Sequence, residues 1–340
     1  MPIVEYTPEM WSALQQAVSR LYGIINLSHR PFVDYYYGTR PSCRLFLYIE
    51  DDGRILGTLG REVMPFLYGN QCITIRTASN WYSLQPGVGV KLTRGLLRVN
   101  PQMPGLMFGG SHDTLKILRR YGWPFIPGIK MHSVNTDAIA WPGEPKWKAR
   151  ARAVRRIFRR PVSIASRLPA EAASGLEVCE EHAYTGDLLP RSSPFTFRFA
   201  PDAEYLTWRY NLALSFVRYR VFRIVARGKS AGYVILNESP QKIIVAQCDG
   251  EDAASLAYGV LLSLAKLEGE QSGRAVYVTS SFPQMQAIFE AAGIKAEPGP
   301  GVPFAFRCEQ WPLEMGMNPS SWLVNYDWGD NGLRSPFLDE

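Results

Sequence analysis

Hydrophobic positions in the first half of the chain switch between helical and strand spacing. Apolar residues from Trp11 to Leu21 recur every three or four positions, which predicts an amphipathic helix that Gly23 ends. Continuous or alternating apolar runs then predict strands, with a tight hairpin turn at 51–53. The further elements expected in this half are strands at 45–49, 54–59, 72–76 and 106–108 and helices at 88–99 and 113–121.

The second half repeats this order of elements. It begins with a helix-like stretch at 202–210 and continues with the expected strands 220–225, 232–236, 243–246 and 275–278 and helices 252–268 and 283–292. Three landmarks correspond between the halves at similar spacings: 35–37 with 208–210, Gly57 with Gly232, and Gly122 with Gly293. A shared order with matching intervals indicates an internal duplication of an α/β unit.

A chain of 340 residues is long enough for two domains. We therefore predict a first domain at 1–145, a basic linker at 146–168, and a second domain at 169–340 that ends in an aromatic tail.

The net charge of +6 is concentrated in one segment. Residues 146–160 contain two lysines, six arginines and no acidic residue, so the rest of the chain is slightly negative. On a helix, Trp147, Ala151, Val154 and Phe158 fall on one side and the cations cover the remainder. Such a helix is typical of an element that binds an anionic membrane surface. A structural linker and an RNA contact are the alternatives.

Composition bears on the cellular location of the protein and on whether it holds disulfides or a metal site. No secretory signal opens the chain, and no uncharged run reaches the roughly 18 residues of a spanning helix. We expect a cytoplasmic protein, with peripheral attachment at the inner membrane surface through 146–160. The five cysteines are scattered and the four histidines show no ligand spacing, so we expect neither disulfides nor a metal site.

A glycine-bearing loop between a strand and a helix is the best candidate for a ligand site. Gly87 and Gly89, separated by one residue, let backbone amides approach an anion at the start of the helix 88–99. Lys91 in the first turn adds a positive charge. The alternative interpretation is a turn that only packs the helix on the sheet.

The loop Gly87-Val88-Gly89, followed by a strand, a helix and Gly122-Trp123, resembles the GNAT (Gcn5-related N-acetyltransferase) superfamily. The resemblance implies an α/β (α+β) fold of two tandem GNAT-like domains, each a mixed, mostly antiparallel sheet flanked by helices. It also implies acetyl-CoA or another acyl-CoA as cosubstrate. The residues expected to contact that cosubstrate are Gln85, Gly87, Val88, Gly89, Val90, Lys91 and Ser111.

The doubled arrangement resembles tandem-GNAT proteins, including FemAB-like transferases. It implies an N-acyltransferase whose amine acceptor is an amino sugar or a cell-envelope glycan precursor. The alternatives are a FemAB-like transferase supplied by aminoacyl-tRNA, in which 146–160 would contact the tRNA, and a GNAT-derived binding protein without catalysis.

The sequence departs from the family pattern at several positions. Leu84 stands where the loop usually begins with Gln or Arg, and Leu118 and Phe289 replace the tyrosine that often protonates the CoA thiolate. In the second half, Glu251 and Asp252 place carboxylates where a pyrophosphate would lie. We therefore expect only the first half to bind CoA.

Candidate residues for the chemistry lie near the loop. His112 is a candidate base, because its usual pKa suits neutral pH; the alternative is a solvated first-turn residue of a helix that Ser111 or Asp113 caps. Tyr82 and Asn80 lie on the strand before the loop, where Tyr82 would donate to the leaving thiolate or simply pack. The cluster Trp208, Arg209 and Tyr210 is expected to line an acceptor pocket, with ordinary helix packing as the alternative.

Overall fold

Two seven-stranded sheets and the helices around them make up the computed structural model. In both sheets neighbouring strands are antiparallel, except for β4–β5 and β11–β12, which are parallel. The structure describes residues 3–21, 26–69, 71–98, 100–136, 147, 150, 154, 161–169, 175–270, 273–309 and 316–328.

Sheet A holds most strands of the first half, and sheet B most strands of the second. In spatial order, sheet A contains β1 (Ile3–Glu5), β2 (Cys43–Ile49), β3 (Ile55–Tyr68), β4 (Gln71–Ser83), β5 (Gly105–Phe108) and β14 (Phe304–Arg307), with β8 (Phe197–Phe199) paired to β3. Sheet B contains β13 (Lys295–Ala296), β6 (Lys130–Val134), β12 (Ala275–Ser280), β11 (Lys242–Gly250), β10 (Lys229–Glu238), β9 (Arg218–Ala226) and β7 (Leu176–Glu181).

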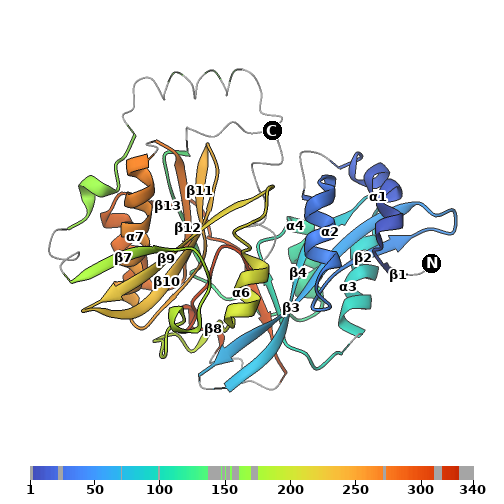
Figure 1. Cartoon of the computed structure of the whole chain (residues 1–340). Helices are drawn as coiled ribbons and strands as arrows, with labels where there is room; N and C mark the ends of the chain where they lie inside the picture. The colour runs from blue at the N-terminus through green and yellow to red at the C-terminus, as the bar shows by residue number, and fades with distance from the viewer. Residues whose placement is uncertain are drawn as a thin grey trace.

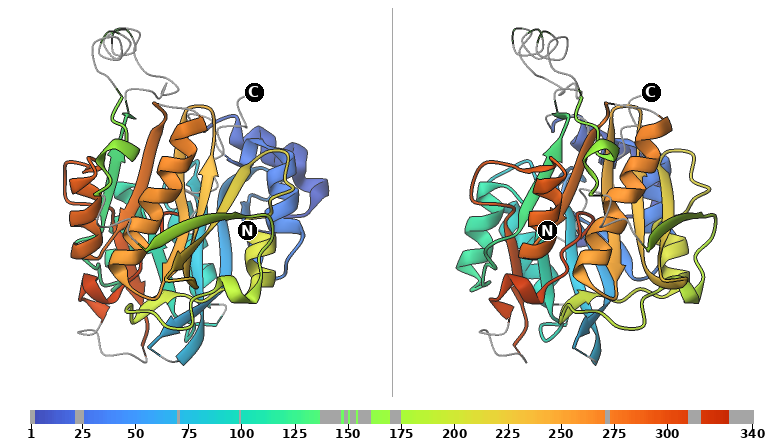
Figure 2. Two further views of the ribbon diagram at one scale, coloured as in Figure 1. Left: turned by 60° about the vertical axis from the view of Figure 1, so that its left-hand side comes forward. Right: turned by 90° about the vertical axis from the view of Figure 1, so that its left-hand side faces the viewer.

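Helices cover the outer faces of both sheets and fill the space between them (Figure 1). The helices are α1 (Trp11–Val18), α2 (Arg30–Gly38), α3 (Val88–Arg98), α4 (His112–Arg120), α6 (Ala203–Arg209), α7 (Ala253–Glu270) and α8 (Pro283–Ala291). Side chains of α3 and α4 share one core with sheet A, and those of α7 and α8 share another with sheet B. The largest core lies between the sheets and includes α1, α2 and α6. The turned views of Figure 2 show α7 and α8 on the outer side of sheet B.

The two halves exchange a strand. β6 follows α4 but pairs with β12, with His132 opposite Val278. β14 follows α8 but pairs with β5, with Phe304 opposite Phe108. Each sheet is therefore completed by the other half of the chain, and the sheets do not follow the predicted ranges 1–145 and 169–340 strand for strand.

The local elements agree with the sequence pattern more closely than the strand lengths do. The helices expected at 113–121 and 252–268 are α4 and α7 within two residues at each end. The strands expected at 54–59 and 72–76 are far longer, because β3 and β4 continue into an extended hairpin whose end pairs with β8. No helix in the described part of the chain is both long and apolar enough to cross a membrane.

Candidate functional site

A cavity opens where two parallel strands of sheet A separate. β4 and β5 pair at Arg76–Gly105 and Thr77–Leu106 and then diverge. The space between them, with a volume of about 540 Å³, extends to the starts of α3 and α4. Its lining residues are Leu21, Ala78, Ser79, Asn80, Trp81, Tyr82, Ser83, Gly89, Met107, Phe108, Gly110, Ser111, Asp113, Thr114 and Ile117.

A bulge in β4 shapes one wall of this cavity. The register against β3 shifts so that Leu59 faces two residues, Asn80 and Trp81. Asn80 has a left-handed backbone with φ of 45°, which asparagine tolerates better than most residues. Its carbonyl oxygen accepts a 2.7 Å hydrogen bond from the Thr58 hydroxyl, and its Nδ2 donates to the Tyr37 hydroxyl at 2.7 Å. Asn80 therefore fixes the bulge, and its side chain is bonded to Tyr37 of α2.

Two helix N-termini border the cavity. α3 starts directly after Gly87, whose φ of 82° favours glycine and beside which a Cβ would meet open space. Within the described residues, the backbone N–H groups of Gly89 and Val90 have no hydrogen-bond acceptor. At α4, the Ser111 hydroxyl accepts from the Thr114 N–H at 3.2 Å. Two positive helix ends thus point toward the same space.

Packing also favours a small residue at position 89. A Cβ there would lie 3.3 Å from Nε1 of Trp81 and 3.5 Å from Cδ1 of Ile117. The indole and the isoleucine occupy the space that a larger residue would need. Gly89 therefore lets Trp81 pack on the helix start and also borders the cavity.

The predicted loop residues divide into two groups. Among the expected cosubstrate contacts, Gly89 and Ser111 line the cavity. The Lys91 ammonium instead donates to the Tyr48 hydroxyl at 2.8 Å and lies over that ring. The remaining residues of that set, Gln85, Gly87, Val88 and Val90, are outside the lining.

The catalytic candidates are also divided. Asn80 and Tyr82 line the cavity, whereas His112 is an exposed first-turn residue outside it. Ser111 caps that helix, as the alternative interpretation expected. Asp113 is the carboxylate among the lining residues, and it pairs with Lys116 at 3.6 Å.

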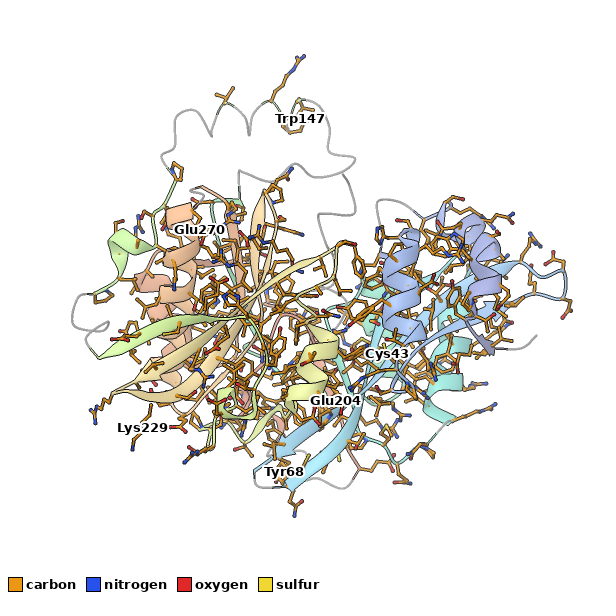
Figure 3. All side chains as sticks on the ribbon, in the orientation of Figure 1. Cys43, Tyr68, Trp147, Glu204, Lys229 and Glu270 are labelled. Atoms are coloured by element: carbon orange, nitrogen blue, oxygen red, sulfur yellow. The ribbon has the colours of Figure 1, made fainter. Side chains whose placement is uncertain are left out.

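The cluster Trp208, Arg209 and Tyr210 lies outside the cavity lining, at the junction of the two halves. All three residues are buried, and α6, beside which Figure 3 labels Glu204, accepts hydrogen bonds from the Tyr35 and Tyr36 hydroxyls of α2 at its Trp208 and Arg209 carbonyls. The Trp208 indole donates to the Thr39 hydroxyl at 2.9 Å, directly after α2. These contacts match the packing alternative.

Arg209 lies in the most polar part of this junction. Its guanidinium is 3.2 Å from Oε2 of Glu62 and 3.3 Å from Oδ1 of Asp327, and it covers the Tyr36 ring at 5.3 Å. Desolvation lowers the Arg209 pKa, but these carboxylates and the neighbouring tyrosines outweigh it, so the pKa is raised well above its usual value. Arg209 stays charged in the core.

The matching gap in the second half is filled by the chain itself. β11 and β12 pair over three residues and then diverge. Segment 322–328 lies against this gap. The Asn325 side chain accepts from the Cys248 N–H at 3.0 Å and donates to the Cys248 carbonyl at 3.1 Å, while the Thr279 hydroxyl donates to the Val324 carbonyl at 3.4 Å. The aromatic tail therefore packs as part of the core, and its residues 329–331 lie outside the described residues.

Several lining residues had no place in the sequence prediction. Trp81 comes from β4, Thr114 and Ile117 come from α4, and Leu21 comes from the segment after α1. One local signal was available, since Gly109 and Gly110, both with positive φ, directly follow β5. Paired glycines after a buried strand indicate a sharp turn into the next helix, in the same way as the loop after β4.

Solved structures with a similar fold include acyltransferases. The GCN5-related N-acetyltransferase of Kribbella flavida is 14% identical, with a TM-score of 0.53 over 90% of this chain and 70% of that one. A tandem GNAT protein from the clavulanic acid biosynthesis pathway is 15% identical, with a TM-score of 0.53 over 90% and 97%. The Saccharomyces cerevisiae N-myristoyltransferase, solved with bound myristoyl-CoA, is 10% identical, with a TM-score of 0.54 over 90% and 79%. No protein-family model and no curated sequence matches the chain. The predicted tandem GNAT-like fold is confirmed.

Proposed function

From this tandem GNAT-like fold we propose that the protein is an acyl-CoA-dependent N-acyltransferase whose first half binds the acyl donor. One observation carries the proposal: the cavity of about 540 Å³ lies between diverging parallel strands and is bordered by two helix N-termini. This volume is within the usual range of small-molecule sites. The N-acetyltransferase and the N-myristoyltransferase of similar fold support the choice of chemistry.

The helix starts suit the phosphate end of the donor. The N–H group of Gly89 and the first turn of α4 would face the diphosphate, whose negative charge favours hydrogen-bond donors and the positive end of a helix. The acyl end would enter between β4 and β5, beside Met107 and Phe108. The filled gap in the second half supports binding of one donor per chain.

Acyl transfer needs an aligned amine and a path for one proton. The amine nitrogen attacks the thioester carbonyl, so a C–N bond forms, the C–S bond breaks, and the CoA sulfur leaves as a thiolate. Tyr82 lines the cavity and would supply a proton to this sulfur. The ammonium proton would pass to water at the open side, where Asp113 and His112 are exposed.

A matched pair of variants at Ile117 tests donor binding. This side chain lies beside Gly89 between the two helix starts, so Ile117→Glu would place a negative charge where the diphosphate is expected. Ile117→Gln has the same size without the charge. At a few ångströms and near the surface, such a repulsion is worth about 2 kcal/mol, so we expect acetyl-CoA to bind Ile117→Glu roughly tenfold or more weakly than Ile117→Gln.

Calorimetry with acetyl-CoA gives the result directly. Equal affinities of the two variants, or no binding by the wild type, would contradict the donor site. Release of free CoA thiol in the presence of amines then measures transfer. Binding without transfer to any amine would favour the non-catalytic binding protein, and transfer only from charged tRNA would favour the FemAB-like alternative.

We propose further that residues 146–160 hold the protein at an anionic membrane surface, near which it meets its acceptor. Most of this segment lies outside the described residues. Of those described, Trp147 is 68% exposed and Val154 is 52% exposed, and Figure 3 shows Trp147 projecting away from both sheets. Exposed apolar side chains among eight cations support binding to anionic lipid, at about 1 kcal/mol for each basic residue near the surface.

A further inference from the structure

A second cavity lies on the outer face of sheet A, alongside α3. Its volume is about 250 Å³, and it shares no lining residue with the cavity between β4 and β5. Most of its wall is apolar: Leu92 and Leu96 project from α3, and Phe46 and Leu59 face them from β2 and β3. The volume corresponds to about eight water-sized groups, since each takes roughly 30 Å³ of liquid volume.

Positive charge gathers at the sheet side of this cavity. Arg61 lines it and stands directly opposite Arg44 across β2 and β3, a like-charged pair that costs stability unless an anion is near. Glu5, also in the lining, is 2.8 Å from Nε of Arg44. The buried Arg76 adds a further guanidinium on β4 outside the lining; burial lowers its pKa most, and Arg307 and Arg61 lower it further. The lining itself therefore holds one cation, Arg61, and one carboxylate, Glu5, which is paired with Arg44 outside the lining.

Arg61 itself is incompletely satisfied. Its guanidinium lies over the Phe46 ring at 5.1 Å, and its Nε is buried without a hydrogen-bond acceptor among the described residues. Burial also lowers the Arg61 pKa, and the small opposing effect of Glu5 does not restore it. The buried Nε is closed to a ligand, so a carboxylate in the cavity would meet the terminal nitrogens of this guanidinium, for which it is the best partner.

We propose that this cavity binds a small anionic amphiphile, with its carboxylate on Arg61 and a short hydrocarbon chain along α3. The apolar walls would cover the chain, and the charge imbalance selects an anion over a neutral or cationic head group. This site is separate from the acyl-CoA site of the proposed function and does not depend on it.

Three eight-carbon ligands test the proposal on the full-length protein. Octanoate, octan-1-ol and octylamine share the chain and differ in the head group. We expect calorimetry to give saturable binding of octanoate, about tenfold or more tighter than that of octanol, because a charged hydrogen bond to Arg61 is lost with the alcohol. Octylamine should bind more weakly still.

Two variants and a control locate the binding. Arg61→Gln should weaken octanoate about tenfold while leaving octanol unchanged. Gly95→Leu should abolish binding of both, because a side chain at this lining position enters the cavity and meets the exposed Ile3. Leucine is also the better helix former, so this variant should fold. Arg94→Gln removes an exposed cation of the same helix and should change nothing.

Several results would overturn the proposal. The first is that the wild type does not bind octanoate, and the second is that it binds octanol and octanoate with equal affinity. The third is that Arg61→Gln or Gly95→Leu, at an unchanged melting temperature, binds octanoate as tightly as the wild type. Acetyl-CoA affinity measured on the same variants shows whether the first cavity is intact, so failure of one site is distinguishable from failure of the other.

Discussion

Replacement of Arg209 separates a structural role from an acceptor-binding role. Its side chain is 2% exposed and bridges Glu62 of β3 and Asp327 of the C-terminal segment, whose side chains are 6% and 0% exposed. Arg209→Met keeps much of the volume and the contact with Tyr36 but removes the charge. The two carboxylates then remain in the core without their shared cation.

The expected loss is large because of what is left behind. At an effective dielectric of about 20, each ion pair at 3.2–3.3 Å is worth about 5 kcal/mol of Coulomb energy, much of it offset by the desolvation of the ions. Removing one partner of a buried pair typically costs about 3–5 kcal/mol. We therefore expect Arg209→Met to lower the free energy of unfolding by about that amount.

Urea unfolding followed by circular dichroism measures this loss, with Arg94→Met as an exposed control that should stay within about 0.5 kcal/mol of the wild type. The double variant Glu62→Gln with Arg209→Met should recover part of the loss, because one uncompensated charge is removed. The structural role would be refuted if Arg209→Met had wild-type stability and a raised KM for the acceptor. That result would support the interpretation of Arg209 as part of an acceptor pocket.

Three further outcomes follow from burial and charge. Cys72 and Cys179 are exposed, whereas Cys43 and Cys248 are buried, and burial raises the pKa of their thiols. Mass spectrometry after brief alkylation should therefore find Cys72 and Cys179 modified before Cys43 and Cys248. Burial raises the pKa of Asp249 from 3.8 to about 6. The folded chain therefore holds the Asp249 proton more tightly than the unfolded chain. The stability contributed by Asp249 is fully present below about pH 4 and is lost as the pH rises through about 6. Urea unfolding of Asp249→Asn should lack this change in the free energy of unfolding with pH. Deletion of 146–160 should abolish co-sedimentation with anionic vesicles, and equal retention of both forms would count against the membrane proposal.

Local pattern was sufficient for most helices and for the position of the loop. The glycine spacing at Gly87 and Gly89 and the duplication led to the tandem GNAT-like fold, which the solved structures confirm. Two of the seven predicted cosubstrate contacts, Gly89 and Ser111, line the cavity. Lys91 does not, because its alkyl chain and charge find a nearer partner in Tyr48 across the helix–sheet interface.

The amino-acid sequence by itself determined the periodicity of each segment, the repeat of the α/β unit and the concentration of charge at 146–160, because these depend on neighbouring residues. Only the tertiary structure decided which strands pair, and so that β6 and β14 are exchanged, that segment 322–328 fills the second gap, and that Arg209 is buried. Such contacts join residues far apart in the chain. Their free energy depends on packing and desolvation at the meeting point, which no local pattern encodes.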